Sequence, residues 1–113
     1  MPNRYIFITD KFEGYHKYVD APEEVAFLRN VHRHLFGVRV KISIFHNDRD
    51  IEFILFKHEI QKFIDQYKAD NQNMSCEAIA ESVYNYLHEK YPNRLCEVEI
   101  NEDGENGAIL GDF

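Results

Sequence analysis

The chain has few cysteines and no long apolar run. Its only two cysteines, Cys76 and Cys96, lie twenty residues apart and form no CxxC pair, which excludes a disulfide framework. No apolar run approaches the roughly 18 residues that a membrane-spanning helix needs. The N-terminal segment has no long apolar stretch after Arg4, so we expect no signal peptide, no membrane partner and a cytoplasmic location.

Positive charge is also scarce. The sequence has thirteen Lys and Arg and twenty Asp and Glu, which gives a formal net charge of −7. A surface this acidic repels phosphate backbones, so we expect no nucleic-acid partner. A small anionic ligand remains compatible with the composition if a bound metal ion supplies a local positive centre.

Large apolar side chains are abundant by contrast. Hydrophobic residues make up 44% of the 113 positions, and nine Phe and seven Tyr are among them. This composition is typical of a folded protein, and the length predicts one domain, residues 1–113.

Alternating side chains predict four strands. The alternation is clearest over Leu35–Phe45, where Val38, Val40, Ile42 and Ile44 point one way, as in a half-buried strand. Richness in β-branched and aromatic residues, or position along the chain, predicts the other three strands at Arg4–Lys11, Leu95–Ile100 and Ala108–Leu110.

Two helices are expected between the second and third strands. The first spans Phe53–Tyr67; the second is capped by Ser75 and runs to Lys90, just before Pro92. The positions predicted to face inward are Phe53, Phe56, Ile60, Phe63, Ile64 and Tyr67 in the first helix and Cys76, Ile79, Ala80, Val83, Tyr84 and Leu87 in the second. The connection Glu13–Asn30 is of mixed character, with a possible helix start at Ala21–Glu24.

The order of elements predicts the fold class. Strand, strand, helix, helix, strand, strand indicates an α+β domain of two layers, in which a four-stranded antiparallel sheet carries two helices on one face.

Three histidines are candidate metal ligands. His32 and His34 open the clearest strand, and side chains two residues apart on a strand share a face, roughly 6.6 Å apart. His16 follows the first strand and supplies the third ligand that zinc sites with an open position require. With six histidines in 113 residues, an HxH pair arises by chance in about 0.3 of such sequences, and three imidazoles suit iron, nickel or copper as well as zinc.

An ordered set of segments resembles the 6-pyruvoyl/6-carboxy-tetrahydropterin synthase family, whose fold is called the T-fold. Its members carry a His after the first strand, an HGH, and segments of the form DF..LK, PTSENLA and V.V.E. The corresponding segments here are Phe12–His16, His32–Val40, Ile51–Lys57, Met74–Ala80 and Val98–Glu102, which together span nearly the whole chain.

The resemblance implies roles for individual residues. His16, His32 and His34 would bind Zn²⁺, and Glu102 would hold the amino-pyrimidine edge of a pterin- or purine-like ligand, with Ser75 and Glu77 nearby. It also implies a homo-oligomer with pockets between subunits. The alternative, from the sequence alone, is that Glu99, Glu102, Asp103 and Glu105 form a solvated acidic turn with no role in ligand binding.

The chain departs from the family at the acid–base positions. Leu28 stands where the family has its catalytic Cys, and Gln66 replaces the His of an Asp-His pair in which Asp65 would be the Asp. A catalytic proton carrier would then be Asp65, Glu77 or Cys76. Cys76 can equally be a small buried apolar residue, although a helix N-terminus could lower its pKa.

Three functions follow from these observations. The first is a zinc-dependent lyase of the pterin synthase type that acts on a pterin-like substrate. The second is a non-catalytic protein that sequesters or senses a pterin- or purine-like molecule, which the missing acid–base groups favour. The third is a structural oligomer that binds no metal.

Overall fold

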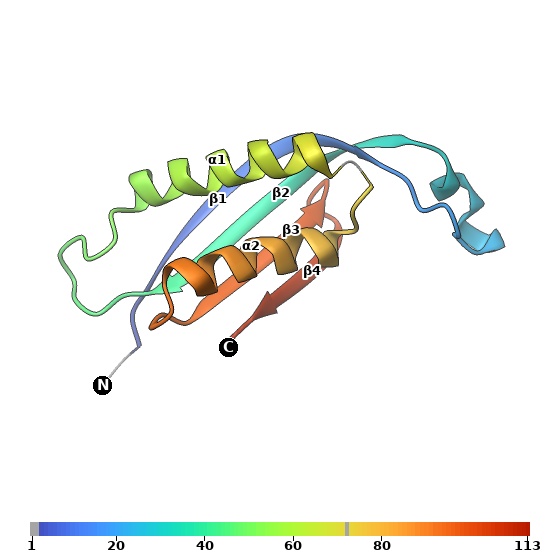
Figure 1. Ribbon diagram of the computed structural model, residues 1–113. Coiled ribbons are helices and arrows are strands. Elements are labelled where there is room, and N and C mark those ends of the chain that lie inside the picture. The colour runs from blue at the N-terminus through green and yellow to red at the C-terminus, as the bar shows by residue number, and fades with distance from the viewer. Residues whose placement is uncertain (1–2, 72) are drawn as a thin grey trace.

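The chain folds as two layers, an antiparallel sheet and a pair of helices (Figure 1). The computed structural model describes residues 3–71 and 73–113. The elements are β1 (Tyr5–His16), a 3₁₀ helix η1 (Glu23–Arg29), β2 (His32–Ser43), α1 (Phe53–Asp70), α2 (Cys76–Lys90), β3 (Cys96–Glu102) and β4 (Asn106–Gly111). This confirms the predicted α+β fold with strands and helices in the order ββααββ.

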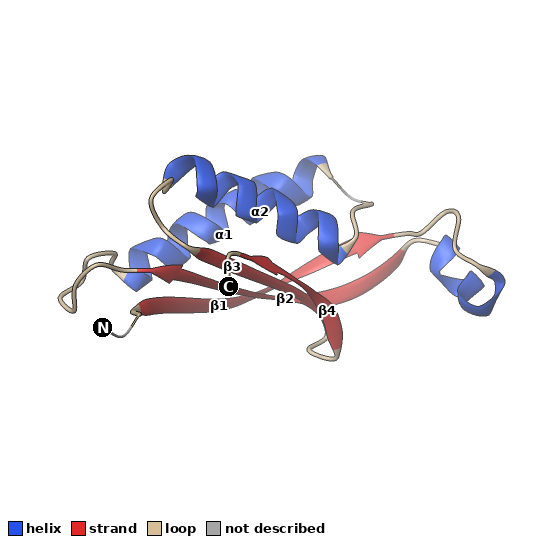
Figure 2. Cartoon of the chain, turned by 90° about the horizontal axis from the view of Figure 1, so that it is seen from below, coloured by secondary structure: helices blue, strands red, loops and turns tan. Residues whose placement is uncertain are grey.

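The sheet has the strand order β1-β2-β3-β4, and every neighbouring pair is antiparallel. Both helices lie on the same side of it (Figure 2). Within the described residues, β1 pairs only with β2 and β4 only with β3, so these two strands form the edges of the sheet. Neither helix is long and apolar enough to cross a membrane.

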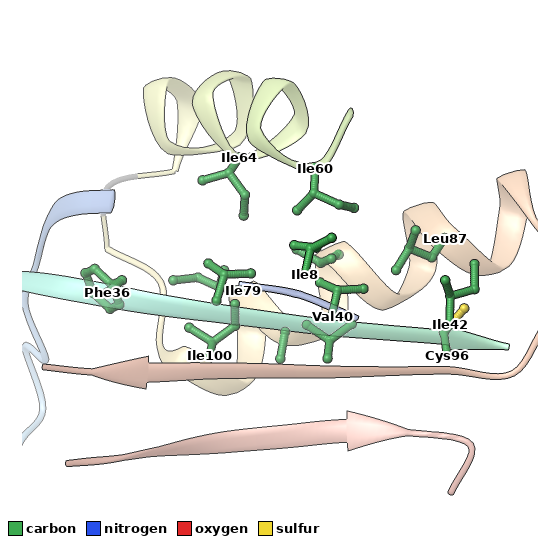
Figure 3. Packing of buried hydrophobic residues seen from close by; sticks show 14 of the residues in the cluster. Ile8, Phe36, Val40, Ile42, Ile60, Ile64, Ile79, Leu87, Cys96 and Ile100 are labelled. Atoms are coloured by element: carbon green, nitrogen blue, oxygen red, sulfur yellow. The ribbon is translucent and has the colours of Figure 1, made fainter. Parts of the chain in front are cut away.

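The core fills the space between the sheet and the helices (Figure 3). Alternation along β2 puts Val38, Val40 and Ile42 against the helices, and each is at most 3% exposed. Leu87 of α2 is fully buried among them. Full burial of one such side chain stabilises the fold by roughly 1.5–3 kcal/mol.

Both helices begin at a side-chain cap. The Glu52 carboxylate accepts a hydrogen bond from the Leu55 backbone N–H (2.7 Å), and the Ser75 hydroxyl accepts one from Ala78 (3.1 Å). The prediction that Phe53 faces the core was wrong: its side chain is 54% exposed. The first three residues of α1 lie outside the core, since Ile54 and Leu55 are also more than half exposed, and the buried face of the helix begins at Phe56.

The β1–β2 hairpin is longer than the sequence predicted. β1 continues past Lys11 to His16, and β2 begins at His32, ahead of the alternating stretch that starts at Leu35. The expected helix start near Ala21 is realised only as the short η1. The hairpin therefore projects beyond the helices and carries η1 at its tip (Figure 1).

Candidate metal centre

The three candidate histidines lie where β1 ends and β2 begins. His16 is paired with His32 in the β1–β2 ladder, and His34 is two residues further along β2. Two-residue periodicity places His32 and His34 on the same sheet face as Phe36 and Val38, which is the face that the helices cover. The cluster therefore continues the row of core positions with polar side chains.

The three imidazoles converge. One ring nitrogen from each of His16, His32 and His34 lies within 4.8 Å of the other two. The ring centroids are 4.4 Å apart for His16 and His32, 4.8 Å for His32 and His34, and 5.1 Å for His16 and His34. This group can hold a metal ion, because three imidazole nitrogens are a common ligand set for one.

Each imidazole uses its Nδ1 atom for a hydrogen bond directed away from the cluster. The partners are the Met74 carbonyl for His16 (3.2 Å), the Asn30 carbonyl for His32 (2.8 Å) and the Asp103 carboxylate for His34 (2.9 Å). Carbonyl and carboxylate oxygens only accept hydrogen bonds, so this geometry requires a proton on each Nδ1, and a ring with no second proton then presents a bare Nε2. Metal-binding histidines are oriented in this way by their outer partners.

The inward nitrogens are buried and lack hydrogen bonds. Nε2 of His32 and Nε2 of His34 are inaccessible to solvent and have no hydrogen-bond partner among the described residues. Leaving a buried polar atom without a partner costs roughly 1–3 kcal/mol. A metal ion bound between the rings would satisfy these atoms, so the residues present fit a metal of the kind that imidazole prefers.

Glu102 faces the cluster from the end of β3. It occupies the next inward position after Ile100 and is paired with Phe36 of β2. Its two carboxylate oxygens lie 3.4 Å from Nε2 of His16 and 3.4 Å from Nε2 of His34. These contacts are longer than a charge-assisted hydrogen bond, which measures about 2.7–2.9 Å. Glu102 thus adds negative charge next to the imidazoles without capping either Nε2 atom.

A cavity of about 500 Å³ opens beside the histidines. Its walls include His16, His32 and Glu102 and the first turn of α2 with its cap. Four more residues that the sequence analysis discussed also line it: Leu28, Ser75, Cys76 and Glu77. A small organic molecule in this cavity would therefore contact both the imidazoles and the Glu102 carboxylate.

Cys76 lies at the inner wall of this cavity. Its side chain is 5% exposed, and its thiol donates a weak hydrogen bond to Glu102 Oε1 at 3.9 Å. Burial, and then the negative charges of Glu102 and Glu77, raise the pKa of the Cys76 thiol to about 12. The helix N-terminus does not lower it, so this thiol is protonated at neutral pH and is a poor nucleophile.

The other predicted acid–base position lies elsewhere. Asp65 is on α1, where its largely exposed carboxylate is 3.6 Å from the Lys68 ammonium. It borders two other depressions, one of which His16 also lines, but not the cavity that His32 and Glu102 line. Gln66 is exposed on the same helix. The structure therefore places Ser75, Cys76, Glu77 and Glu102 in one cavity with His16 and His32, and Asp65 outside that cavity.

Asp103, which the sequence analysis assigned only to a solvated acidic turn, contacts one of the candidate metal ligands. Besides its bond to His34, its carboxylate accepts the Leu35 backbone N–H at 3.0 Å. These two bonds lower the pKa of Asp103 below its usual range, in that order of importance. Its position directly after Glu102 was the available signal, but its partner lies 69 residues earlier in the chain.

The raised pKa of Cys76 predicts slow alkylation. About one Cys76 thiol in ten thousand is ionised at pH 8, against about a quarter of unperturbed cysteines. We expect iodoacetamide to modify the folded protein slowly, at a rate that rises about tenfold per pH unit between pH 8 and 10, and to modify both cysteines quickly in urea. Peptide mass spectrometry would follow the two cysteines separately. Cys96 is also buried and should likewise react slowly in the folded protein. Alkylation of native Cys76 at the rate of a free thiol would contradict this account.

Comparison with known proteins adds no family assignment. No protein-family model matches the chain, and no curated protein matches it in sequence.

Proposed function

We propose that the chain is a zinc-binding protein that resembles 6-pyruvoyl/6-carboxy-tetrahydropterin synthases and acts on a pterin-like molecule held beside the metal. The observation that carries this proposal is the convergence of three imidazoles whose Nδ1 atoms are all bonded outward. Two of their inward Nε2 atoms are buried without a hydrogen bond to any residue that the structure describes, next to a cavity that a carboxylate also lines.

Zinc is the metal proposed for this ligand set, which iron, nickel or copper would also suit. His16, His32 and His34 would hold it, and three protein ligands leave a fourth position for water or substrate. When bound there, zinc would polarise a ligand oxygen or activate water. The outer hydrogen bonds already orient the three imidazoles with Nε2 directed inward, so binding needs no rotation of the rings.

The cavity has the chemistry to select a pterin-like ring. A volume of about 500 Å³ is within the range of small-molecule sites. The Glu102 carboxylate at its inner end can accept two parallel N–H bonds from an amino-pyrimidine edge. Ser75 and Glu77 border the same space and can contact polar groups of the ligand.

Proton transfer is the step for which the chain is least equipped. Leu28 lines the cavity but cannot carry a proton, and Cys76 holds its proton too tightly to serve as a base at neutral pH. Among the predicted candidates, Glu77 is the exposed carboxylate in the cavity wall. General acid–base groups typically contribute about 10²–10⁴-fold each to a rate. A lyase reaction here would therefore rely on Glu77 and be slow.

These same facts support a second function, a protein that binds the ligand without converting it. The metal cluster, the cavity and Glu102 suffice for binding, whereas Leu28 and Cys76 remove two sources of acid–base catalysis. Such a protein would sequester or sense a pterin- or purine-like molecule.

The homo-oligomer also belongs to this proposal. β1 and β4 are open edges within the described residues, and exposed strand edges tend to pair with other chains. The cavity lies beside the projecting hairpin, so a neighbouring subunit would be able to complete its wall.

Metal analysis tests the zinc site. We expect the purified protein to contain about one zinc per chain and the double variant His32→Ala/His34→Ala to contain none, because it lacks two of the three ligands. The matched control is His58→Ala/His88→Ala, which removes two exposed helical histidines and should keep the zinc. Equal zinc in all three proteins, or none in any, would contradict the proposed site.

Ligand binding and turnover separate the two functions. We expect a dihydroneopterin-type pterin to bind the zinc protein and to bind at least about tenfold more weakly to His32→Ala/His34→Ala, which would be followed by fluorescence titration. Mass spectrometry of the recovered ligand then decides between them: a ring product of lower mass, with the released fragment of the side chain making up the difference, indicates a lyase, and recovery unchanged indicates a binding protein. Absence of pterin binding by the zinc-loaded protein would count against both.

A further inference from the structure

We propose that Asp103 is a positioning residue of the metal centre, which holds His34 in the tautomer with its proton on Nδ1 and so keeps Nε2 free to bind the metal. This inference rests on the proposed metal site. Asp103 touches neither the metal position nor the cavity wall described above; it acts through His34.

Asp103 is fixed to β2 by three hydrogen bonds. Its Oδ2 accepts from His34 Nδ1 at 2.9 Å, its Oδ1 accepts from the Leu35 N–H at 3.0 Å, and its own N–H donates to the Leu35 carbonyl at 2.8 Å. Asp103 has φ of 57°, a left-handed conformation that Asp and Asn adopt more readily than most residues. The carboxylate is therefore held in one orientation, with one oxygen committed to each donor.

The partner of His34 differs from the partners of the other two ligands. His16 and His32 donate to the neutral carbonyls of Met74 and Asn30, whereas His34 donates to a charged carboxylate. A carboxylate partner makes the imidazole a stronger electron donor to a metal and fixes its ring orientation. Asp103 thus makes His34 the most strongly supported ligand of the cluster.

The tautomer matters because a nitrogen that carries a proton cannot bind a metal. If the proton of His34 moved to Nε2, the atom that faces His16 and Glu102 would be blocked. An Asp-to-Asn change behind a functional histidine is known to reverse its tautomer in this way. The same logic applies to Asp103, because its two oxygens face two different N–H donors.

Asp103→Asn is the sharp test. If the amide oxygen keeps the Leu35 N–H, the amide NH₂ faces His34 Nδ1 and favours the tautomer protonated on Nε2. The reverse orientation would set NH₂ against the Leu35 N–H, donor against donor. Asn tolerates the positive φ, so the turn is retained. The control Glu105→Gln removes the same charge from an exposed position two residues along the turn.

Two measurements are needed on each protein. The first is the tautomer of His34 in the metal-free state, read from long-range ¹H–¹⁵N correlation spectra of histidine-labelled protein at about pH 8.5, where free imidazole is neutral. The second is the zinc Kd from competition with a chelator of known affinity. Circular dichroism confirms that each variant is folded.

We expect wild-type His34 to carry its proton on Nδ1, Asp103→Asn to shift it to Nε2 and raise the zinc Kd by about 10–100-fold, and Glu105→Gln to change neither. An unchanged tautomer or an unchanged Kd in Asp103→Asn overturns the inference, as does an Nε2 proton in the wild type. Failure of the wild type to bind zinc overturns the proposed function itself. The two failures are distinguishable because the tautomer is measured without metal.

Discussion

The register between β1 and β2 is the constraint on which both the core and the candidate site depend. It pairs Phe12 with Phe36, whose rings stack at 5.1 Å, and His16 with His32. A shift of one residue would turn every side chain of one strand to the opposite face. Gly14, opposite His34, leaves room for this packing, because a Cβ there would lie 2.8 Å from the Phe36 ring. The stacked rings and the imidazole cluster are therefore built by one ladder.

The cluster is costly to the protein unless something binds to it. The Nε2 atoms of His32 and His34 are withdrawn from water and have no hydrogen-bond partner within residues 3–71 and 73–113. The Glu102 carboxylate lies 3.4 Å from the Nε2 atoms of His16 and His34, beyond the length of a charge-assisted hydrogen bond. A folded protein keeps such an arrangement when it serves a site. The ligands also come from the separate strands β1 and β2 and their outer partners from three further segments, so the site exists only in the folded chain and metal binding would stabilise the fold.

Much of the fold could be predicted because its core follows simple periods. The alternation of Val38, Val40 and Ile42 and the helical spacing of Ile60 and Ile64 correspond to buried side chains. The end of β1 could not be predicted, because its inward positions there are Gly14 and His16 rather than apolar residues. The exposure of Phe53 was missed because a helical period does not show at which residue the buried face of a helix begins.

The candidate site was predictable in part for a related reason. His32 and His34 share a face by strand geometry alone, so their proximity follows from the sequence. The contribution of Asp103 does not, because it arises from a turn that meets β2 only after the whole sheet has formed. The separation of Asp65 from the cavity likewise depends on how α1 packs, which local sequence does not specify.

X-ray absorption spectroscopy at the zinc edge of the zinc-loaded protein tests the central claim most directly. The account predicts a first shell of nitrogen and oxygen ligands at about 2.0–2.1 Å, with the outer-shell scattering of three imidazoles and no sulfur. The protonated, buried Cys76 thiol would then take no part in binding. A sulfur ligand at about 2.3 Å, or a shell with fewer than three imidazoles, would contradict it.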